Sequence, residues 1–247
     1  MITGASSGIG RGLALEIASR GAKVGLVARR REILDEVVGQ IKQMGSNAVA
    51  LPGNVEDPAA MRDLATRLET EVGPIDVMIA NAGIGATTDA AELDATEVAR
   101  VLSVNVVGAA ASVSAVVPGM LKRGHGQLVA ISSLAGYRGL PKSASYGASK
   151  AALSSFFESL RLDLEPRGIK VTIIHPGFIK TPLTAGREAK MPFLMELDDA
   201  VKKIIGAIEK QKKSYAFPWQ LATIVRAGMV MPNWMYDRIS RRNSFRE

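Results

Sequence analysis

Two patterns of apolar and polar residues alternate along the chain. Short apolar runs, which are typical of buried parallel strands, occupy residues 24–27, 48–51, 76–80, 127–132, 171–174 and 215–217. Longer segments with apolar positions three or four residues apart, which are typical of helices, occupy residues 13–20, 32–44, 58–72, 95–123, 144–165 and 198–212. Strand and helix therefore alternate through most of the sequence.

This alternation predicts the fold class. Repeated strand–helix–strand units build α/β proteins, in which parallel strands are joined by right-handed crossovers. We therefore predict a Rossmann-like, doubly wound parallel sheet of about seven strands with helices on both faces. We expect residues 1–247 to form a single domain.

The amino-acid composition excludes several kinds of catalytic and metal-binding site. The 247 residues are 47% hydrophobic, enough for a sizeable core. The chain has no cysteine, which excludes disulfides, thiolate catalysis and cysteine metal sites. Its two histidines, His125 and His175, do not suggest a metal cluster. We therefore predict no metal site.

The net charge of +7 is concentrated late in the chain. Beyond residue 211 the basic residues outnumber the acidic ones; they are Lys212, Lys213, Arg226, Arg238, Arg241, Arg242 and Arg246, against Asp237 and Glu247. The remainder is nearly balanced, which argues against nucleic-acid binding. We find no uninterrupted apolar stretch near the roughly 20 residues of a membrane helix, nor a signal peptide. We expect a cytoplasmic protein.

Three glycines near the start suggest a phosphate site. Gly4, Gly8 and Gly10 lie between a strand and a helix, where glycines permit a tight turn, close approach of a pyrophosphate and close helix–strand packing. A helix N-terminus also offers free N–H groups to an anion. The spacing differs from G-x-G-x-x-G, and a glycine-rich turn alone is common.

Only Met1 and Ile2 precede Thr3, although such a loop normally follows a longer strand in the middle of the sheet. We expect either that the natural chain begins upstream or that this strand is unusually weak.

Further motifs join the glycines in a fixed order. These are Thr3-Gly4-x-x-x-Gly8-Ile9-Gly10, Asn81-Ala82-Gly83, Asn105, Ser133, Tyr146-x-x-x-Lys150 and Pro176-Gly177-x-x-x-Thr181. Together they resemble the short-chain dehydrogenase/reductase (SDR) family over residues 1 to 185. The resemblance implies a nicotinamide-dependent oxidoreductase that reduces a carbonyl or oxidises a secondary alcohol. It also implies a homodimer or homotetramer formed through the helices at 95–123 and 144–165.

The residue after the second strand selects the coenzyme in dinucleotide folds. A carboxylate there binds the ribose of NAD, whereas an arginine pairs with the 2′-phosphate of NADP. Here Arg29, Arg30 and Arg31 follow Ala28. We predict NADP(H) in preference to NAD(H), with Arg29 as the first candidate, Arg30 as the second and Arg31 on the surface. The alternative is that all three begin a solvated helix.

The resemblance assigns the cofactor contacts. Ser6 would assist the phosphate-binding arginine, Asn54 and Val55 would contact the adenine, and the Ile179 backbone would contact the carboxamide. The complete set that we expect is Gly4, Ser6, Ser7, Gly8, Ile9, Gly10, Arg29, Arg30, Asn54, Val55, Asn81, Ala82, Gly83, Tyr146, Lys150, Pro176, Gly177, Ile179 and Thr181. Asn54 departs from the family, where aspartate is usual, but retains a carbonyl acceptor.

The expected catalytic residues are Asn105, Ser133, Tyr146 and Lys150. Tyr146 and Lys150 are four residues apart on a predicted helix, so their side chains point the same way. A free phenol has a pKa of about 10, and a nearby ammonium favours the phenolate, which suits a general acid/base. The resemblance implies that Ser133 binds the substrate oxygen and that Asn105 holds a proton-relay water.

The resemblance implies that two later segments determine the identity of the substrate. Residues 182–197 form a predicted substrate loop, whose Met191, Phe193, Leu194 and Met195 indicate an apolar substrate. Residues 218–247 form a basic, amphipathic C-terminal extension. It could contact a membrane surface, its own domain or a partner subunit; membrane contact is not the favoured interpretation.

The main alternative function is a catalytically silent dinucleotide-binding sensor or scaffold on the same fold. The complete set of Asn105, Ser133, Tyr146 and Lys150 argues against it. A weaker alternative is a lipid-surface protein in which the dehydrogenase core is secondary.

Overall fold

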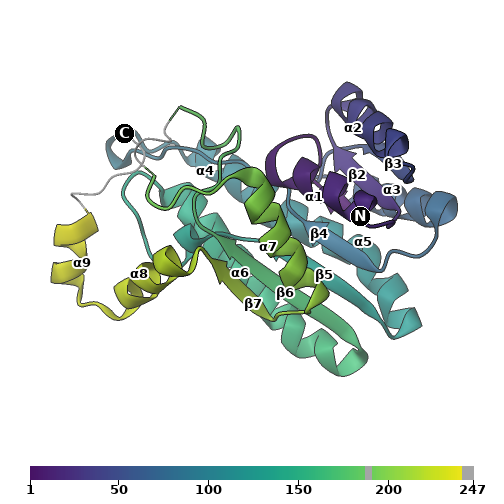
Figure 1. Ribbon diagram of the computed structural model, residues 1–247. Coiled ribbons are helices and arrows are strands. Elements are labelled where there is room, and N and C mark those ends of the chain that lie inside the picture. The colour runs from purple at the N-terminus through teal and green to yellow at the C-terminus, as the bar shows by residue number, and fades with distance from the viewer. Residues whose placement is uncertain (187–190, 241–247) are drawn as a thin grey trace.

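The computed structural model describes residues 1–186 and 191–240, and its centre is one parallel sheet (Figure 1). Within these residues the sheet has seven strands in the order β3-β2-β1-β4-β5-β6-β7. They are β1 (Ile2–Thr3), β2 (Val24–Ala28), β3 (Ala48–Pro52), β4 (Val77–Ala80), β5 (Gly126–Ile131), β6 (Ile169–Pro176) and β7 (Ser214–Phe217). Every neighbouring pair is parallel. The predicted doubly wound fold is therefore confirmed.

Helices cover both faces of the sheet. The α-helices are α1 (Gly8–Ser19), α2 (Arg31–Gln43), α3 (Pro58–Val72), α4 (Ala95–Leu102), α5 (Gly108–Arg123), α6 (Ala144–Leu164), α7 (Leu197–Glu209), α8 (Trp219–Val230) and α9 (Asn233–Ser240). Buried residues of α1, α2 and α7 join one hydrophobic core, whereas those of α3, α5 and α6 join the other. Neighbouring strand residues such as Leu26 and Val27 alternate between these two cores, as the period of a strand requires.

The single helix predicted over 95–123 is interrupted. A π-helical turn, η2 (Ser103–Val107), separates α4 from α5 and contains the buried Asn105. π-Turns inside helices frequently occur at functional sites. By length and composition the run Ala95–Arg123 is apolar enough to cross a membrane. It packs instead against α3, α6 and the central strands, so we assign it to the core of the protein.

β1 has only two residues although it lies between β2 and β4. Met1 extends the pairing, since its amino group donates to Val77 O (2.9 Å) and its carbonyl accepts from Ile79 N (2.9 Å). The backbone of β4 is thereby hydrogen-bonded at the positions beside the short strand.

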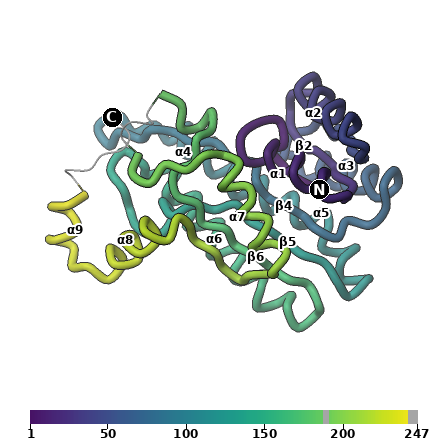
Figure 2. Tube along the Cα trace, in the orientation of Figure 1, coloured from purple at the N-terminus to yellow at the C-terminus, as the bar shows by residue number. Residues whose placement is uncertain are grey.

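The structure describes most of the predicted substrate loop and of the C-terminal extension. Residues 187–190 of the predicted substrate loop and residues 241–247 of the C-terminal extension, which include Arg241, Arg242 and Arg246, lie outside the described residues. The remainder of the extension forms α8 and α9. Figure 2 shows these two helices at the end of the molecule opposite to α2 and β3.

Candidate active site

A cavity of about 1080 Å³ lies at the carboxyl ends of the central strands. The glycine loop and the ends of β2 and β3 line one part of it, and residues after β5 and β6 together with α8 and α9 line the other. Crevices beyond the carboxyl ends of strands are the usual ligand sites of doubly wound sheets. This location is therefore the candidate active site.

The glycine loop is shaped by close backbone packing. Gly4 has a φ of +65°, and a Cβ there would lie 2.9 Å from Ala82 Cα. A Cβ on Gly10 would lie only 2.3 Å from Gly4 O. Gly10 does not line the cavity. Its lack of a side chain lets the start of α1 pack closely on the loop at Gly4, as the sequence predicted for one of the three glycines.

The Asn81-Ala82-Gly83 motif fastens this loop to β4. Asn81 Nδ2 donates to Thr3 O (2.9 Å) and Gly4 O (3.3 Å). In return, the Thr3 hydroxyl oxygen accepts hydrogen bonds from the backbone N–H groups of Asn81 and Ala82, each at 3.1 Å. The motif lines the cavity and also holds the glycine loop in position.

The N-terminus of α1 faces the cavity through Ser7 and Gly8. Ser7 occupies the N-cap position without a capping hydrogen bond from its side chain, and the first turn has no acidic residue. The first N–H groups of the helix and its positive dipole end therefore suit an anion. Thr181 borders the same place, 3.5 Å from the position of a Cβ on Gly8.

The arginine nearest to the glycine loop differs from the first candidate chosen from the sequence. Arg30 Nη2 donates to Ser6 Oγ (3.1 Å), so Arg30, not Arg29, forms the expected pair with Ser6. Both arginines line the cavity and are exposed. Arg31 does not line it and contacts Asp35 at 3.4 Å on the surface of α2. Arg30 occupies the N-cap position of α2, and its hydrogen bond to Ser6 favours it over Arg29 as the partner of that serine.

Asn54 and Val55 lie where β3 ends and also line the cavity. Asn54 Oδ1 accepts a hydrogen bond from Glu56 N (3.3 Å). Val55 is buried against α5, where a Cβ on Gly108 would meet it at 2.6 Å. Glycine at position 108 thus lets α5 approach this wall.

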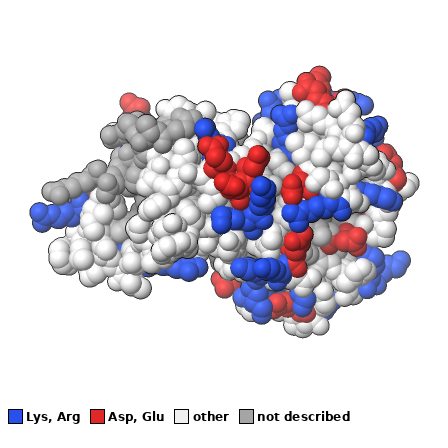
Figure 3. Space-filling model, in the orientation of Figure 1, with Lys and Arg blue, Asp and Glu red and all other residues white. Residues whose placement is uncertain are grey.

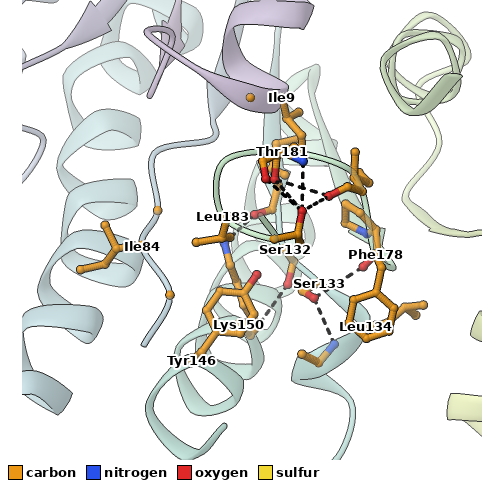
Figure 4. Close-up of a pocket in the computed structure, with 18 of the residues that line it drawn as sticks. Ile9, Ile84, Ser132, Ser133, Leu134, Tyr146, Lys150, Phe178, Thr181 and Leu183 are labelled. Atoms are coloured by element: carbon orange, nitrogen blue, oxygen red, sulfur yellow. Dashed lines mark hydrogen bonds between the residues drawn. The ribbon is translucent and has the colours of Figure 1, made fainter. Parts of the chain in front are cut away.

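Ser133, Tyr146 and Lys150 line one part of the cavity, beside Thr181 and Leu183 (Figure 4). The Lys150 ammonium donates to Ile131 O (2.8 Å) and lies 5.8 Å from the centre of the Tyr146 ring. Burial lowers the pKa of Lys150 to about 8. The lysine therefore still carries its charge at neutral pH, next to the phenol.

Ser133 is held by the turn that follows β5. Its Oγ accepts from Ala135 N (3.1 Å), and its hydroxyl is 3.5 Å from Pro176 O, a long contact that leaves the proton available to another acceptor. The neighbouring Ser132 points away from this position and bonds to Lys150 O and Ser154 Oγ on α6. The alternation of an extended chain thus separates the two serines.

The Asn105 side chain is fully engaged with protein atoms. Its Nδ2 donates to Ile84 O (3.0 Å) and Ser149 Oγ (2.9 Å), and its Oδ1 accepts from Ile84 N (2.8 Å). Asn105 does not line the cavity. Its side chain joins the segment after β4 to α6, close to Lys150, and its part in holding a proton-relay water stays a prediction.

The segment after β6 is fixed by its own polar groups. Thr184 Oγ1 donates to Ile179 O (2.6 Å) and accepts from Thr181 N (3.0 Å). Met195 N donates to Phe178 O (3.0 Å) and Lys180 N to Met195 O (2.9 Å), which closes the base of the substrate loop. Of the loop residues singled out in the sequence, Met191 and Phe193 line the cavity, whereas Leu194 and Met195 do not.

His175 is buried and does not line the cavity. Burial and the positive charge of Arg226 lower its pKa to about 4, so the ring is neutral at neutral pH. It packs edge-on against Tyr137, with ring centres 5.0 Å apart. The structure gives it a packing role.

Arg138 is a residue of the site that the sequence did not reveal. It lines the cavity, and its guanidinium donates to the carbonyls of Gly228 and Met231 and to Asn233 Oδ1 (2.7 Å). It also stacks on the Tyr236 ring, 3.9 Å from the centroid, and Tyr236 donates to Gly139 O (2.6 Å). We call this set the Arg138 clasp; no local motif marks it, because its partners are about 90 residues away.

Nearly all of the predicted site residues meet at this one cavity. Of the predicted set, only Gly10 and Asn105 do not line it, and both support residues that do.

Comparisons with known proteins agree with this geometry. Residues 1–192 match the model of the short chain dehydrogenase family. The chain is 45% identical over 242 residues to an uncharacterized oxidoreductase of Myxococcus xanthus, covering 98% of this chain and 96% of the relative. It is 39% identical over 189 residues to 11-beta-hydroxysteroid dehydrogenase 1A of Arabidopsis thaliana, covering 76% and 54%.

Among solved structures, a 3-ketoacyl-ACP reductase from Sinorhizobium meliloti is similar, with a TM-score of 0.79 and 29% sequence identity over 88% of this chain and 95% of that one. The chain belongs to the short-chain dehydrogenase/reductase family, whose members are oxidoreductases that use nicotinamide dinucleotides.

Proposed function

We propose that this protein is an NADP(H)-dependent reductase or dehydrogenase acting on a carbonyl or secondary alcohol of an apolar substrate. One observation carries the proposal. The cavity that Ser133, Tyr146 and Lys150 line also contains the glycine loop and the Arg30–Ser6 pair. A proton donor and a site for a phosphorylated dinucleotide therefore share one space.

The residues fit such a coenzyme. The uncapped N-terminus of α1 would hold the pyrophosphate, and Arg30 with Ser6 would hold the 2′-phosphate, with Arg29 nearby. Asn54 and Val55 would border the adenine. When bound, the nicotinamide supplies or accepts the hydride.

Residues of the chain would transfer the proton to or from the substrate. Tyr146 donates a proton to the substrate oxygen during reduction or removes one during oxidation. The buried, charged Lys150 stabilises the phenolate that this transfer leaves on Tyr146. Ser133 donates a hydrogen bond to the same substrate oxygen and so orients it.

The opposite part of the cavity favours an apolar substrate. Its lining is mostly hydrophobic and includes Leu134, Leu140, Pro141, Leu183, Met191, Phe193, Leu221, Ile224 and Val225. Burial of such surface contributes about 25 cal/mol per Å². The similarity to a protein named for hydroxysteroids supports this substrate class.

The proton-transfer role is tested by NADPH oxidation across a panel of apolar ketones. Tyr146→Phe should lower kcat roughly 10²- to 10⁴-fold, the usual contribution of general acid catalysis. Tyr215→Phe is the matched control, because Tyr215 lies in β7 outside the cavity. Equal turnover in wild type and Tyr146→Phe would refute the assignment.

The coenzyme choice is tested by three single variants. Arg30→Ala should raise KM for NADPH by roughly 10-fold or more, because a hydrogen bond to a charged group contributes about 1.5–3 kcal/mol, and should leave KM for NADH nearly unchanged. Arg29→Ala should have a smaller effect of the same kind. Arg31→Ala, on the surface, is the control. A wild-type preference for NADH would overturn the proposal.

The oligomer implied by the family is a separate proposal. Val107 and Leu162 are exposed apolar residues within the two long helical runs through which the family resemblance implies association. Light scattering of the purified chain should give the mass of a dimer or tetramer.

A further inference from the structure

The C-terminal helices expose more apolar surface than a water-facing segment normally does. Seven large apolar side chains of α8 and α9 are exposed: Trp219, Ile224, Met229, Val230, Trp234, Met235 and Ile239. Four of them, Trp219, Ile224, Met229 and Val230, lie on α8, whose buried residues are Leu221, Ala222 and Gly228. Exposed apolar side chains gathered in one segment mark a surface that contacts a partner or a membrane.

The charged residues of the same segment are mostly basic. Arg226 and Arg238 are exposed, and neither forms an ion pair within residues 1–186 and 191–240. Over the sequence from 218 to 247, five arginines face only two acidic residues, Asp237 and Glu247. Figure 3 shows the part of the molecule that contains α8 and α9 as mostly uncharged, with basic residues near its margin.

The same helices form the mouth of the cavity. Ile224 and Ile239 line the cavity and are also 58% and 48% exposed, so they stand at its rim. Phe193 and Leu183, at 46% and 45% exposed, occupy the rim in the same way on the segment after β6. An apolar compound could therefore pass from an apolar phase beside α8 and α9 into the site.

From these observations we propose that α8 and α9 dock the protein on an anionic phospholipid surface, with the mouth of the cavity towards the lipid. Tryptophan settles at the level of the headgroups, and arginine is attracted by anionic lipids. The part of the proposal that concerns substrate entry rests on the proposed apolar substrate. The Arg138 clasp connects both helices to residues that line the cavity, so the proposed docking surface and the site are in direct contact.

A second copy of the chain is a poorer occupant of this surface. A two-fold contact brings the same patch of each subunit together. Arg226 and Arg238 would then face another basic segment with few carboxylates to neutralise them. An anionic lipid surface supplies the missing negative charge.

The chain contains its own reporters for the test. Its only tryptophans are Trp219 and Trp234, at 73% and 71% exposed, so fluorescence excited selectively at tryptophan reports on this segment alone. Vesicles of phosphatidylcholine with phosphatidylglycerol should shift the emission to shorter wavelength and protect it from iodide. Pure phosphatidylcholine should do so less. Emission that does not change with either vesicle would overturn the proposal, as would blue emission without vesicles from a dimer seen by light scattering.

Flotation of the full-length protein with the same vesicles tests the residues. Trp219→Ser combined with Trp234→Ser should lower the bound fraction at least 10-fold. Met44→Ser combined with Leu93→Ser, which removes two exposed apolar side chains elsewhere, should leave it unchanged. Each of Arg226→Gln and Arg238→Gln should weaken binding to anionic vesicles roughly 5-fold. Circular dichroism confirms that each variant is folded, and equal flotation of all variants would refute the assignment.

These measurements need neither coenzyme nor turnover. A protein that fails to bind vesicles would leave the proposed reaction standing, whereas an active-site variant that keeps full turnover would leave the lipid docking standing. The two proposals can therefore fail separately.

Discussion

The two ends of the cavity are built in different ways. At the coenzyme end, backbone atoms and one amide decide the shape: Gly4 and Gly10 pack against neighbouring main chain, and Asn81 fastens them to β4. At the substrate end, long side chains decide it, with Arg138 and Tyr236 holding α8 and α9 over the site. At the first end, larger side chains would collide with the neighbouring main chain. At the second end, the shape of the cavity can be altered by substituting side chains.

On this contrast, substitutions at the two ends should have different consequences. Main-chain contacts depend on every residue along a segment, so a single substitution disturbs the whole loop. A side-chain contact involves few atoms beyond its partners, so its loss is local. Stability should therefore respond most to changes at the coenzyme end, and substrate KM most to changes at the substrate end.

The largest effect is expected at Gly10. In Gly10→Ala the new Cβ would lie 2.3 Å from Gly4 O and 2.5 Å from Asn81 Nδ2, and neither atom has room to move. We expect a loss of about 3 kcal/mol in the free energy of unfolding, with NADPH binding weakened as well. Urea denaturation and coenzyme titration measure both.

Gly39→Ala is the control for that change. Gly39 lies within α2, and a Cβ there would meet nothing within 4 Å. This substitution should stabilise the protein by up to about 1 kcal/mol. If Gly10→Ala proved as stable as wild type, the coenzyme end would be less rigid than we describe.

The next effect concerns Lys150, which lies between the two ends. Its pKa is about 8 in the folded protein and 10.5 ordinarily. Between these values the unfolded chain binds a proton that the folded one has lost, so the free energy of unfolding should rise with pH across this window, by about 3 kcal/mol in total. Below pH 8 both states are protonated, and the full cost of burying the charge is present.

Lys150→Met should remove this rise while abolishing most activity. Denaturation at pH 7.5 and 10.5 in wild type and variant measures it. Lys202→Met, an exposed change on α7, is the control and should retain the wild-type profile. Parallel profiles in wild type and Lys150→Met would show that burial of the ammonium costs little.

Breaking the Arg138 clasp should separate the two ends kinetically. Arg138→Met loses hydrogen bonds to the end of α8 and to Asn233. We expect KM for bulky apolar substrates to rise roughly 10-fold, in line with about 1.5 kcal/mol for a charged hydrogen bond, and the Kd of NADPH to stay the same. Arg67→Met, whose guanidinium pairs with Glu71 on the surface of α3, is the control. A parallel loss of coenzyme affinity would contradict the division between the ends.

The smallest effect is expected at Phe193. Its side chain lines the cavity but is 46% exposed. Phe193→Ala should leave the free energy of unfolding within about 0.5 kcal/mol of wild type and raise substrate KM a few-fold. Steady-state kinetics and thermal unfolding measure both quantities. A large loss of stability would show that this loop is as integral to the fold as the glycine loop.

Periodicity along the chain was enough to predict the alternating strands and helices, because each element buries one face or both faces of its own residues. The same patterns could not predict the π-helical turn at Ser103–Val107. Its residues are mostly apolar and fit a continuous helix equally well, and the turn is visible only in the backbone. The sequence ranked Arg29 above Arg30 because Arg29 directly follows the second strand, and it could not show that Arg30 contacts Ser6.

What the sequence determined by itself is the sheet, the glycine loop and the list of residues that meet in the site. These follow from local properties: the period of apolar positions, the lack of a side chain at Gly4 and Gly10, and the order of the motifs. Tertiary structure alone decided that Arg30 pairs with Ser6, that Asn105 is fully bonded to Ile84 and Ser149, and that the Arg138 clasp carries α8 and α9. Each of these contacts joins residues far apart in the chain, and such contacts are fixed only when the elements pack together.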